Sequence, residues 1–160
     1  MQERIERLRR RAADDRGFTM IELLVVVVII GVLVAIAVPV YLNYRKGAAD
    51  KSAQSDVRGA VSAIEQFYTD NGNTYPASDT AQNFGTTPES EIVLALTSGG
   101  TGSQKITLSD KTQIGYVNNT TSYLLCGNND GGSGKWFIYN SANGGSVKAA
   151  AGTLTLATCA

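Results

Sequence analysis

The first residues that could do chemistry surround one carboxylate at the start of a long apolar run. Glu22 lies four residues after Phe18, and a charged leader ends just before that residue at Arg16-Gly17. A charged side chain at the centre of a bilayer costs roughly 2.5 to 3.5 kcal/mol, so Glu22 needs either a partner or a shallow position. The sequence therefore predicts a specific role for Glu22, with a glutamate that simply reaches the lipid headgroups as the alternative.

Patterns typical of enzymes are weak in this chain. It contains no histidine, the side chain most often used for acid-base catalysis and for binding zinc, copper or iron. The glycine-rich stretch 131–135 has Asn129 and Trp136 where a phosphate-binding loop needs a glycine and a hydroxyl residue. Residues 128–130 lack the alternating acids of a calcium-binding EF-hand. We expect no enzyme, no catalytic residue, no metal site and no cofactor.

The only two cysteines, Cys126 and Cys159, lie late in the chain, in the part expected to be exported. A disulfide between them is the favoured interpretation, and two unrelated free thiols are the alternative. Closing a loop of that length removes roughly 3 to 4 kcal/mol of unfolded-state freedom. Such a link would matter in a head with a small core.

The charges are unevenly spread, although the formal net charge is zero. Residues 1–17 hold six arginines against four acids, which leaves eight basic and ten acidic residues in the rest of the chain. That balance argues against a protein that binds duplex DNA through a basic surface, while weak DNA binding stays open. The greater basic density before the apolar run predicts a cytoplasmic N-terminus and an exported remainder.

The elements that must position Glu22 begin with the uncharged apolar run 23–42. As a helix this run is about 30 Å long, which matches the hydrocarbon core of a bilayer. Gly31 and Pro39 lie inside it, and both are poor helix formers, so a kink or a soft stretch is expected between them. A plain membrane anchor tolerates such residues without consequence.

The pattern then becomes amphipathic over residues 45–72, where apolar residues recur at spacings of three and four. This periodicity predicts a helix with one stripe to bury. We expect it to continue the apolar helix without interruption and to stop at Asn71-Gly72, because both residue types tolerate the left-handed conformation that ends helices.

Beyond residue 72 the sequence predicts a small head, so that the whole fold is α+β with a long N-terminal helix. Residues 73–104 are expected to form a connecting loop with a short helix from Ile92 to Thr97. An antiparallel sheet of three to five strands, with a C-terminal disulfide loop, is expected in 105–160. Its short β-branched or aromatic runs are 105–108, 113–117, 122–126, 136–139 and 153–157.

The stretch G-F-T-M-I-E-L-L at residues 17–24, followed by the apolar run, closely resembles the processing site of type IV prepilins. The likeness covers about residues 16–72, whereas the head is similar only in its layout. Further matching positions are Gly31, Pro39, Tyr41 and Tyr44.

This resemblance implies that residues 1–17 are a cytoplasmic leader, removed by a prepilin peptidase that cleaves between Gly17 and Phe18. The new amine of Phe18 would then be N-methylated. Residues 18–44 would first span the membrane and later form the core of a filament, in which the stretch from Gly31 to Pro39 loses helical structure. Glu22 would neutralise the amine of Phe18 in the same or an adjacent subunit, which offsets the desolvation of both charges.

The function implied is that of a structural subunit of a type IV pilus, for adhesion, motility or DNA uptake. The subunit would be a single-pass membrane protein before assembly and part of an extracellular helical filament of identical copies afterwards. The implied partners are the prepilin peptidase and methyltransferase, the assembly platform protein with its ATPase motor, minor pilins, and membrane lipid before assembly.

Besides a minor pilin located at the filament tip, three alternatives remain at the level of sequence. The first, within the same family, is a pseudopilin of a type II secretion system or of a competence pseudopilus, because residues 67–76 are similar to the segment after the helix in both groups. The second is a secreted binding module with an ordinary signal peptide cleaved after Ala35-Ile36-Ala37, although the length of the apolar run and Glu22 argue against it. The third is a membrane-anchored receptor or enzyme.

Overall fold

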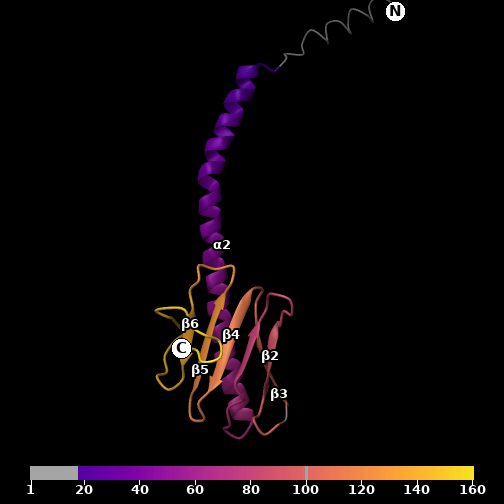
Figure 1. Cartoon of the computed structure of the whole chain (residues 1–160), viewed down its shortest axis with the longest axis vertical. Helices are drawn as coiled ribbons and strands as arrows, with labels where there is room; N and C mark the ends of the chain where they lie inside the picture. Colours follow the sequence, from indigo (N-terminus) through magenta and orange to yellow (C-terminus); the bar gives the residue numbers. More distant parts are fainter. Residues whose placement is uncertain (1–17, 100) are drawn as a thin grey trace, which may run out of the picture. The chain divides into compact units, whose positions relative to one another are not determined.

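The computed structural model describes residues 18–99 and 101–160 of the chain. It forms two compact units, of which the first ends at Tyr41 and the second runs from Leu42 to Ala160. The leader, with Gly17 on one side of the expected cleavage site, lies outside the described residues. One helix, α2 (Met20–Asp70), supplies the described helical part of the first unit and the beginning of the second (Figure 1). The expected uninterrupted helix is confirmed.

Helix α2 ends where the sequence predicts. Its last residue is Asp70, and Gly72 and Asn73 follow with φ angles of 63° and 59°. The amide of Asn73 donates a hydrogen bond to the Tyr68 carbonyl at 2.9 Å, and the side-chain amide of Asn71 donates to the Phe67 carbonyl at 2.8 Å. Because Gly72 and Asn73 adopt left-handed backbone conformations, the chain can turn away from the helix axis. The carbonyls of Phe67 and Tyr68 in the last turn still accept hydrogen bonds.

The head combines two antiparallel sheets. A five-stranded sheet has the order β1-β4-β5-β6-β7, and a separate hairpin pairs β2 with β3. The long central pair β4 and β5 joins Gly115 to Cys126 and Ile114 to Gly127. The strands are β1 (Asp79–Gln82), β2 (Glu91–Ala95), β3 (Thr101–Thr107), β4 (Thr112–Asn118), β5 (Tyr123–Asn129), β6 (Phe137–Asn140) and β7 (Lys148–Ala149).

The short helix expected from Ile92 to Thr97 is wrong, because most of this segment belongs to strand β2. Ile92 and Leu94 are buried while Val93 between them is exposed, which is the period of two of a half-buried strand. Ile92 faces Ile106 of β3 in the ladder. The segment is too short for the helical and strand periods to be told apart.

The strand expected at 153–157 is also wrong, since this segment is irregular and ends in a turn. Leu154 and Leu156 are half-buried and pack beside Cys126 and Trp136, but they make no strand ladder. The alternation of apolar and polar residues in this segment therefore reflects the partial burial of Leu154 and Leu156, without backbone pairing to a neighbouring strand. Strands β1 and β7 were not expected, because they are short edge strands without an apolar run. Residues 73–104 thus hold β1, β2 and the start of β3 in place of a loop with a helix.

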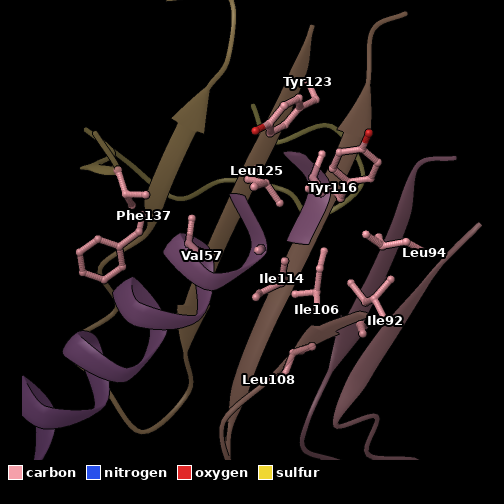
Figure 2. Packing of buried hydrophobic residues seen from close by; sticks show 14 of the residues in the cluster. Val57, Ile92, Leu94, Ile106, Leu108, Ile114, Tyr116, Tyr123, Leu125 and Phe137 are labelled. Atoms are coloured by element: carbon pink, nitrogen blue, oxygen red, sulfur yellow. The ribbon is translucent and has the colours of Figure 1, made fainter. Parts of the chain in front are cut away.

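The main core lies between the second half of α2 and the sheets (Figure 2). Ile64 and Val57 of the helix are fully buried, as are Ile114 and Leu125 of the central strands. The buried helical residues recur at spacings of three and four: they are Asp50, Ala53, Val57, Ala60, Ile64 and Phe67. The five apolar members belong to the stripe that the sequence predicts, whereas the burial of Asp50 was not predicted.

Carboxylates of the same helical half bind the head at separate points. Asp50, which is buried, accepts hydrogen bonds from the amide and hydroxyl of Ser133 at 2.9 and 2.6 Å. Asp56 accepts the corresponding two bonds from Ser109 at 2.8 and 2.9 Å. Each aspartate therefore fixes a loop to α2, and charge-assisted bonds of this kind are stronger than neutral ones.

A third carboxylate, Glu65, accepts a hydrogen bond from the hydroxyl of Tyr123 at 2.7 Å. Burial raises the pKa of Tyr123 well above its ordinary value, and the bond to Glu65 raises it further. Burial also raises the pKa of Tyr116, whose hydroxyl donates to the Pro76 carbonyl at 3.2 Å. Both phenols are therefore held in their neutral form within the core.

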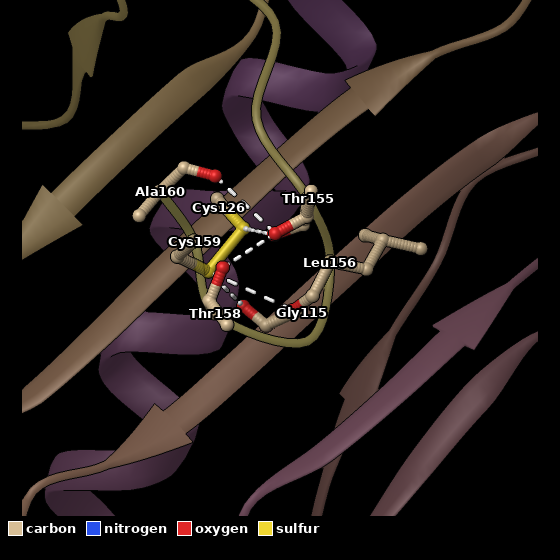
Figure 3. Close-up of a disulfide and its surroundings, with 7 residues drawn as sticks. All are labelled: Gly115, Cys126, Thr155, Leu156, Thr158, Cys159 and Ala160. Atoms are coloured by element: carbon tan, nitrogen blue, oxygen red, sulfur yellow. Dashed lines mark hydrogen bonds between the residues drawn. A yellow bond between two sulfur atoms is a disulfide. The ribbon is translucent and has the colours of Figure 1, made fainter.

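The expected disulfide is present between Cys126 and Cys159, whose Cα atoms are 5.4 Å apart (Figure 3). It ties the C-terminal segment to strand β5, with Trp136 in the same buried cluster. The segment crosses β4 so closely that a Cβ atom at Gly115 would overlap the Leu156 carbonyl. A glycine is required there because of this close backbone approach.

Candidate assembly site

The N-terminus of α2 is built by a reciprocal pair of side chains. The Glu22 carboxylate oxygen Oε2 accepts hydrogen bonds from the Thr19 amide at 2.9 Å and from the Thr19 hydroxyl at 2.8 Å. The amide of Glu22 in turn donates to the Thr19 hydroxyl at 3.3 Å. With Met20 as the first helical residue, Thr19 is the N-cap and Glu22 the third helical position, which is the geometry of a capping box.

Sequence analysis singled out Glu22 but missed its contact with Thr19. The signal was present, because a threonine followed three residues later by a glutamate before an apolar run is the sequence signature of a capping box. The expected pair of Glu22 with a free amine on Phe18 stays a prediction, since Phe18 follows Gly17 in the sequence and its nitrogen is part of a peptide bond. No hydrogen bond to the second carboxylate oxygen of Glu22, Oε1, is made within the described residues.

The rest of the first unit presents apolar side chains without covering them. Phe18 is 75% exposed and Ile29 is 53% exposed, and every residue from Phe18 to Ala48 is exposed to a large extent. By length and composition this part of α2 could cross a membrane. Such a surface is stable only against lipid or against other apolar surfaces.

One face of this apolar helix carries a shallow groove of about 340 Å³. Its lining repeats at helical spacing, from Met20 through Leu23 and Leu24 to Val27 and Val28. Rows of this kind receive the side-chain ridges of a second helix. At 3.6 residues per turn Glu22 lies on the opposite side of the helix from this row, so the groove and the carboxylate are on different faces of α2.

Gly31 and Pro39 both lie within continuous helix. A Cβ atom at Gly31 would meet nothing within 4 Å, so packing inside this chain does not require glycine at that position. Pro39 lacks an amide donor and leaves one helical carbonyl without its bond. Loss of helical structure between these residues stays a prediction.

The second unit contains no metal-binding arrangement among its described residues, because no group of three His, Cys, Asp or Glu side chains converges in the part of the chain that the structure covers. Two polar clefts in this unit open onto its surface. One is lined by charged residues including Arg45 and Lys111, and the other lies beside the end of α2.

Comparison with known proteins gives the N-terminal arrangement a class. Residues 13–38 match the family model described as the prokaryotic N-terminal methylation motif. The chain is 28% identical over 131 residues to the fimbrial protein EcpC of Eikenella corrodens, which covers 81% of this chain and 85% of that protein.

Two further relatives match over a shorter stretch. The chain is 34% identical over 83 residues to the type IV major pilin protein PilA of Myxococcus xanthus, covering 52% of this chain and 36% of that one. It is 39% identical over 65 residues to the type II secretion system core protein G of Pectobacterium carotovorum, covering 41% of each. The chain thus spans most of the first relative and less than half of these two.

These matches confirm the resemblance to type IV prepilins. The chain is similar to pilins in its prepilin-type N-terminus, its long helix with an apolar first half and its antiparallel head. The motif, the apolar helix and the fimbrial relatives fit a membrane-anchored precursor and a mature extracellular pilus. They support a structural pilus subunit, and the similarity to the secretion protein fits the pseudopilin alternative.

Proposed function

We propose that this chain is the structural subunit of a type IV pilus, cut between Gly17 and Phe18 and assembled without any catalytic activity of its own. The observation that carries the proposal is the contrast within α2. Its first part exposes apolar side chains next to Glu22, which caps the helix together with Thr19. Its second part buries one face in a folded head. A subunit of this form needs a second apolar environment once it leaves lipid, and the helices of identical copies supply one.

The carboxylate of Glu22 has room for two tasks. Its Oε2 atom caps its own helix through Thr19. Its Oε1 atom accepts no hydrogen bond within the described residues, so it is available to a cationic amine. Cleavage creates such an amine on Phe18, and pairing the two charges inside an apolar bundle removes most of the penalty of burying either one alone. The pair would fix how far one subunit slides along its neighbour.

Removal of Glu22 tests this mechanism. The variants Glu22→Ala and Glu22→Asp, with Ser55→Ala at an exposed position in the second half of α2 as a control, would replace the native copy in the organism that carries it. We expect Glu22→Ala to be cleaved and inserted but to yield at least tenfold fewer filaments by electron microscopy. Glu22→Asp should restore part of the yield, and the control should be normal. Abundant normal filaments from Glu22→Ala would refute the charge pair.

Processing is tested separately on the mature protein. Mass spectrometry of surface filaments should show an N-terminus at Phe18 that carries one methyl group. A mature protein that begins after Ala37 would indicate an ordinary signal peptide instead, and one that retains the leader would indicate a plain membrane anchor.

A second candidate is a pseudopilin of a type II secretion system, which is favoured by the similarity to core protein G. The more extensive similarity to a fimbrial protein favours the pilus. A deletion strain separates the two, because loss of surface filaments with normal protein secretion supports the pilus and the reverse supports the pseudopilin. The partners proposed are other pilins, the prepilin peptidase and methyltransferase, and a membrane platform with its motor.

A further inference from the structure

A cleft of about 380 Å³ lies against the first turns of α2 that belong to the head. We name it the charged cleft and define it by the segments that line it, which are residues 45–52 of α2, residues 109–111 before β4, and residues 129–131 at the end of β5. Its volume lies within the range of roughly 300 to 1,000 Å³ typical of small-molecule sites. The lining contains two cations, Arg45 and Lys111, and one carboxylate.

Packing brings the two cations toward the same opening. Arg45, Ala49 and Ser52 recur at helical spacing, so they share one face of α2. A Cβ atom at Gly131 would lie 3.6 Å from Cδ of Lys111 and 3.9 Å from Cβ of Ala49. The Lys111 stem therefore runs beside the helical face that carries Arg45, and the glycine leaves the space between loop and helix open.

Hydrogen bonds hold the two loops in place and leave the charged side chains of the lining free. Ser109 is bound to Asp56 through both its amide and its hydroxyl. The Asn129 side chain donates to the Asp110 carbonyl at 2.8 Å and to the Thr112 hydroxyl at 3.0 Å. Among the residues that the structure describes, none of the three charged side chains in the lining makes a hydrogen bond or an ion pair.

The backbone amides of these loops are largely occupied. The amide of Lys111 donates to the Asn83 carbonyl at 3.1 Å. That of Gly131 donates to the Asn129 side chain at 2.9 Å. An extended peptide binds by pairing with a row of free backbone groups, so the charged cleft does not suit one. The amide of Asp110 has no partner within the described residues and adds one donor for an anionic group.

The cleft begins where the apolar run ends. Arg45 follows Leu42, the last residue of that run, by three residues, which is about 4.5 Å along a helix. Tyr41 and Tyr44 on either side of Leu42 are 62% and 76% exposed. Because tyrosines concentrate at the level of lipid headgroups, this part of α2 marks the membrane surface in the anchored precursor. The charged cleft therefore starts at the level of the headgroups.

The charges of the lining select among phospholipid headgroups. The guanidinium of Arg45 and the ammonium of Lys111 suit the oxygens of a phosphate, which all these headgroups carry. The carboxylate of Asp110 would repel an anionic headgroup but can accept hydrogen bonds from a primary ammonium. Phosphoethanolamine carries both the phosphate and such an ammonium. Phosphoglycerol has no cation, and the quaternary ammonium of phosphocholine has no N–H donor.

From these observations we propose that the charged cleft binds the phosphoethanolamine headgroup of a membrane lipid before the subunit joins a filament. Arg45 and Lys111 bind the phosphate, and Asp110 binds the amine. The bound lipid would hold the head against the membrane surface and would be released when the subunit leaves the bilayer. The proposal rests on the membrane-anchored precursor and goes beyond the assembly of the pilus.

The test uses the full chain in dodecyl maltoside micelles, whose headgroup carries neither phosphate nor charge. Amide NMR shifts of residues 109–111 and 129–131 would be followed while dihexanoyl phosphatidylethanolamine is added. The same titration is made with the matching phosphatidylcholine and phosphatidylglycerol and with free O-phosphoethanolamine. We expect phosphatidylethanolamine to saturate the site and the other two lipids to bind at least fivefold more weakly. Free O-phosphoethanolamine should also bind more weakly, because the micelle concentrates only the lipid beside the cleft.

The variant Arg45→Gln/Lys111→Gln removes both cations and should weaken binding of phosphatidylethanolamine at least tenfold. Arg58→Gln, which removes an exposed cation of the same helix outside the cleft, is the matched control and should bind normally. Asp110→Asn should abolish the preference for phosphatidylethanolamine over phosphatidylglycerol. If the double variant does not fold, Asp110→Asn alone must still remove this preference.

Four results would overturn the proposal: no shifts at the cleft with phosphatidylethanolamine, equal binding of the three lipids, tighter binding of free O-phosphoethanolamine than of the lipid, or binding unchanged by loss of the two cations. If this last result came with loss of filaments in the organism, the cleft would serve a second copy of the chain instead. Because the titration uses unassembled subunits, its failure leaves the proposed pilus function standing, and absence of native filaments leaves the lipid site standing.

Discussion

The two halves of α2 use similar apolar residues in opposite surroundings. Ile29 in the first half is 53% exposed, whereas Ile64 in the second half is fully buried against the sheets of the head. The second half therefore completes its burial within one chain, and the first half does not. One continuous helix therefore forms part of the head's core in its second half. In its first half it presents an apolar surface that must be covered by lipid or by other copies of the chain.

The largest expected effect comes from placing a carboxylate in each half. We expect Ile64→Asp to destabilise the head by more than about 4 kcal/mol, because it buries a charge without a partner. Ile29→Asp should leave the head intact and instead reduce membrane insertion. Urea unfolding followed by the fluorescence of the single tryptophan, Trp136, measures the first effect, and membrane fractionation measures the second. Equal loss of head stability in both variants would remove the distinction between the halves.

Removal of the disulfide should have the next largest effect and should be confined to the head. The double variant Cys126→Ala/Cys159→Ala frees a loop closed over a sequence separation of 33 and should lower the free energy of unfolding by about 3 to 4 kcal/mol. Helix formation in the first half, measured by amide exchange in micelles, should not change. A stability equal to that of the native chain would show that packing alone holds the C-terminal segment.

The third prediction concerns alkaline pH. The raised pKa of Tyr123 means that the folded head keeps this phenol protonated while the unfolded chain ionises it near its ordinary value of about 10. Its contribution to stability is thus fully present below about pH 10 and decreases as the pH rises above it, by up to roughly 1.4 kcal/mol per pH unit.

The variant Tyr123→Phe provides the check on that pH dependence. It loses the bond to Glu65 and should be less stable by about 1 to 2 kcal/mol at neutral pH. Its stability should then fall less steeply between pH 10 and 11 than that of the native chain, as measured by urea unfolding at each pH. If stability fell equally steeply with pH in the variant and in the native chain, a group other than Tyr123 would be responsible for the loss of stability at alkaline pH.

The smallest expected effect lies at the capping box of the first half. Thr19→Ala removes the hydroxyl that bonds the Glu22 carboxylate and amide. We expect amide exchange over residues 20–23 to become roughly fivefold faster, the usual consequence of losing an N-cap, with no change in head stability. Thr19→Ser keeps the hydroxyl and should behave like the native chain, so equal exchange rates in all three proteins would exclude the cap.

Periodicity explains which features the sequence could predict. The apolar run, the stripe through Val57 and Ile64, and the helix end at Gly72 depend on local residue types, and each was confirmed. Strand β2 failed as a prediction because five residues cannot separate two periods, and β1 failed because its pairing with β4 comes from the partner strand. Such short edges are specified by tertiary contacts rather than by their own residues.

The candidate site divides in the same way. Glu22 and the two cysteines stand out by type, and the Thr19 contact was available as a motif. The polar cleft beside the end of α2 could not be foreseen, because its threonines come from three segments that are far apart in the sequence. The end of α2, the turn after β2 and the β4–β5 turn bring these residues around one opening.

The closely packed C-terminal segment has a wider consequence for the head. Strands β4 and β5 meet α2 on one face and the disulfide-linked segment on the other, so both faces of the sheet centre are covered (Figure 3). The surface that the head presents is therefore made of its loops, turns and outer strands together with the outer face of α2. Substitutions could accumulate in those parts and alter what the surface meets, while both buried clusters stay the same.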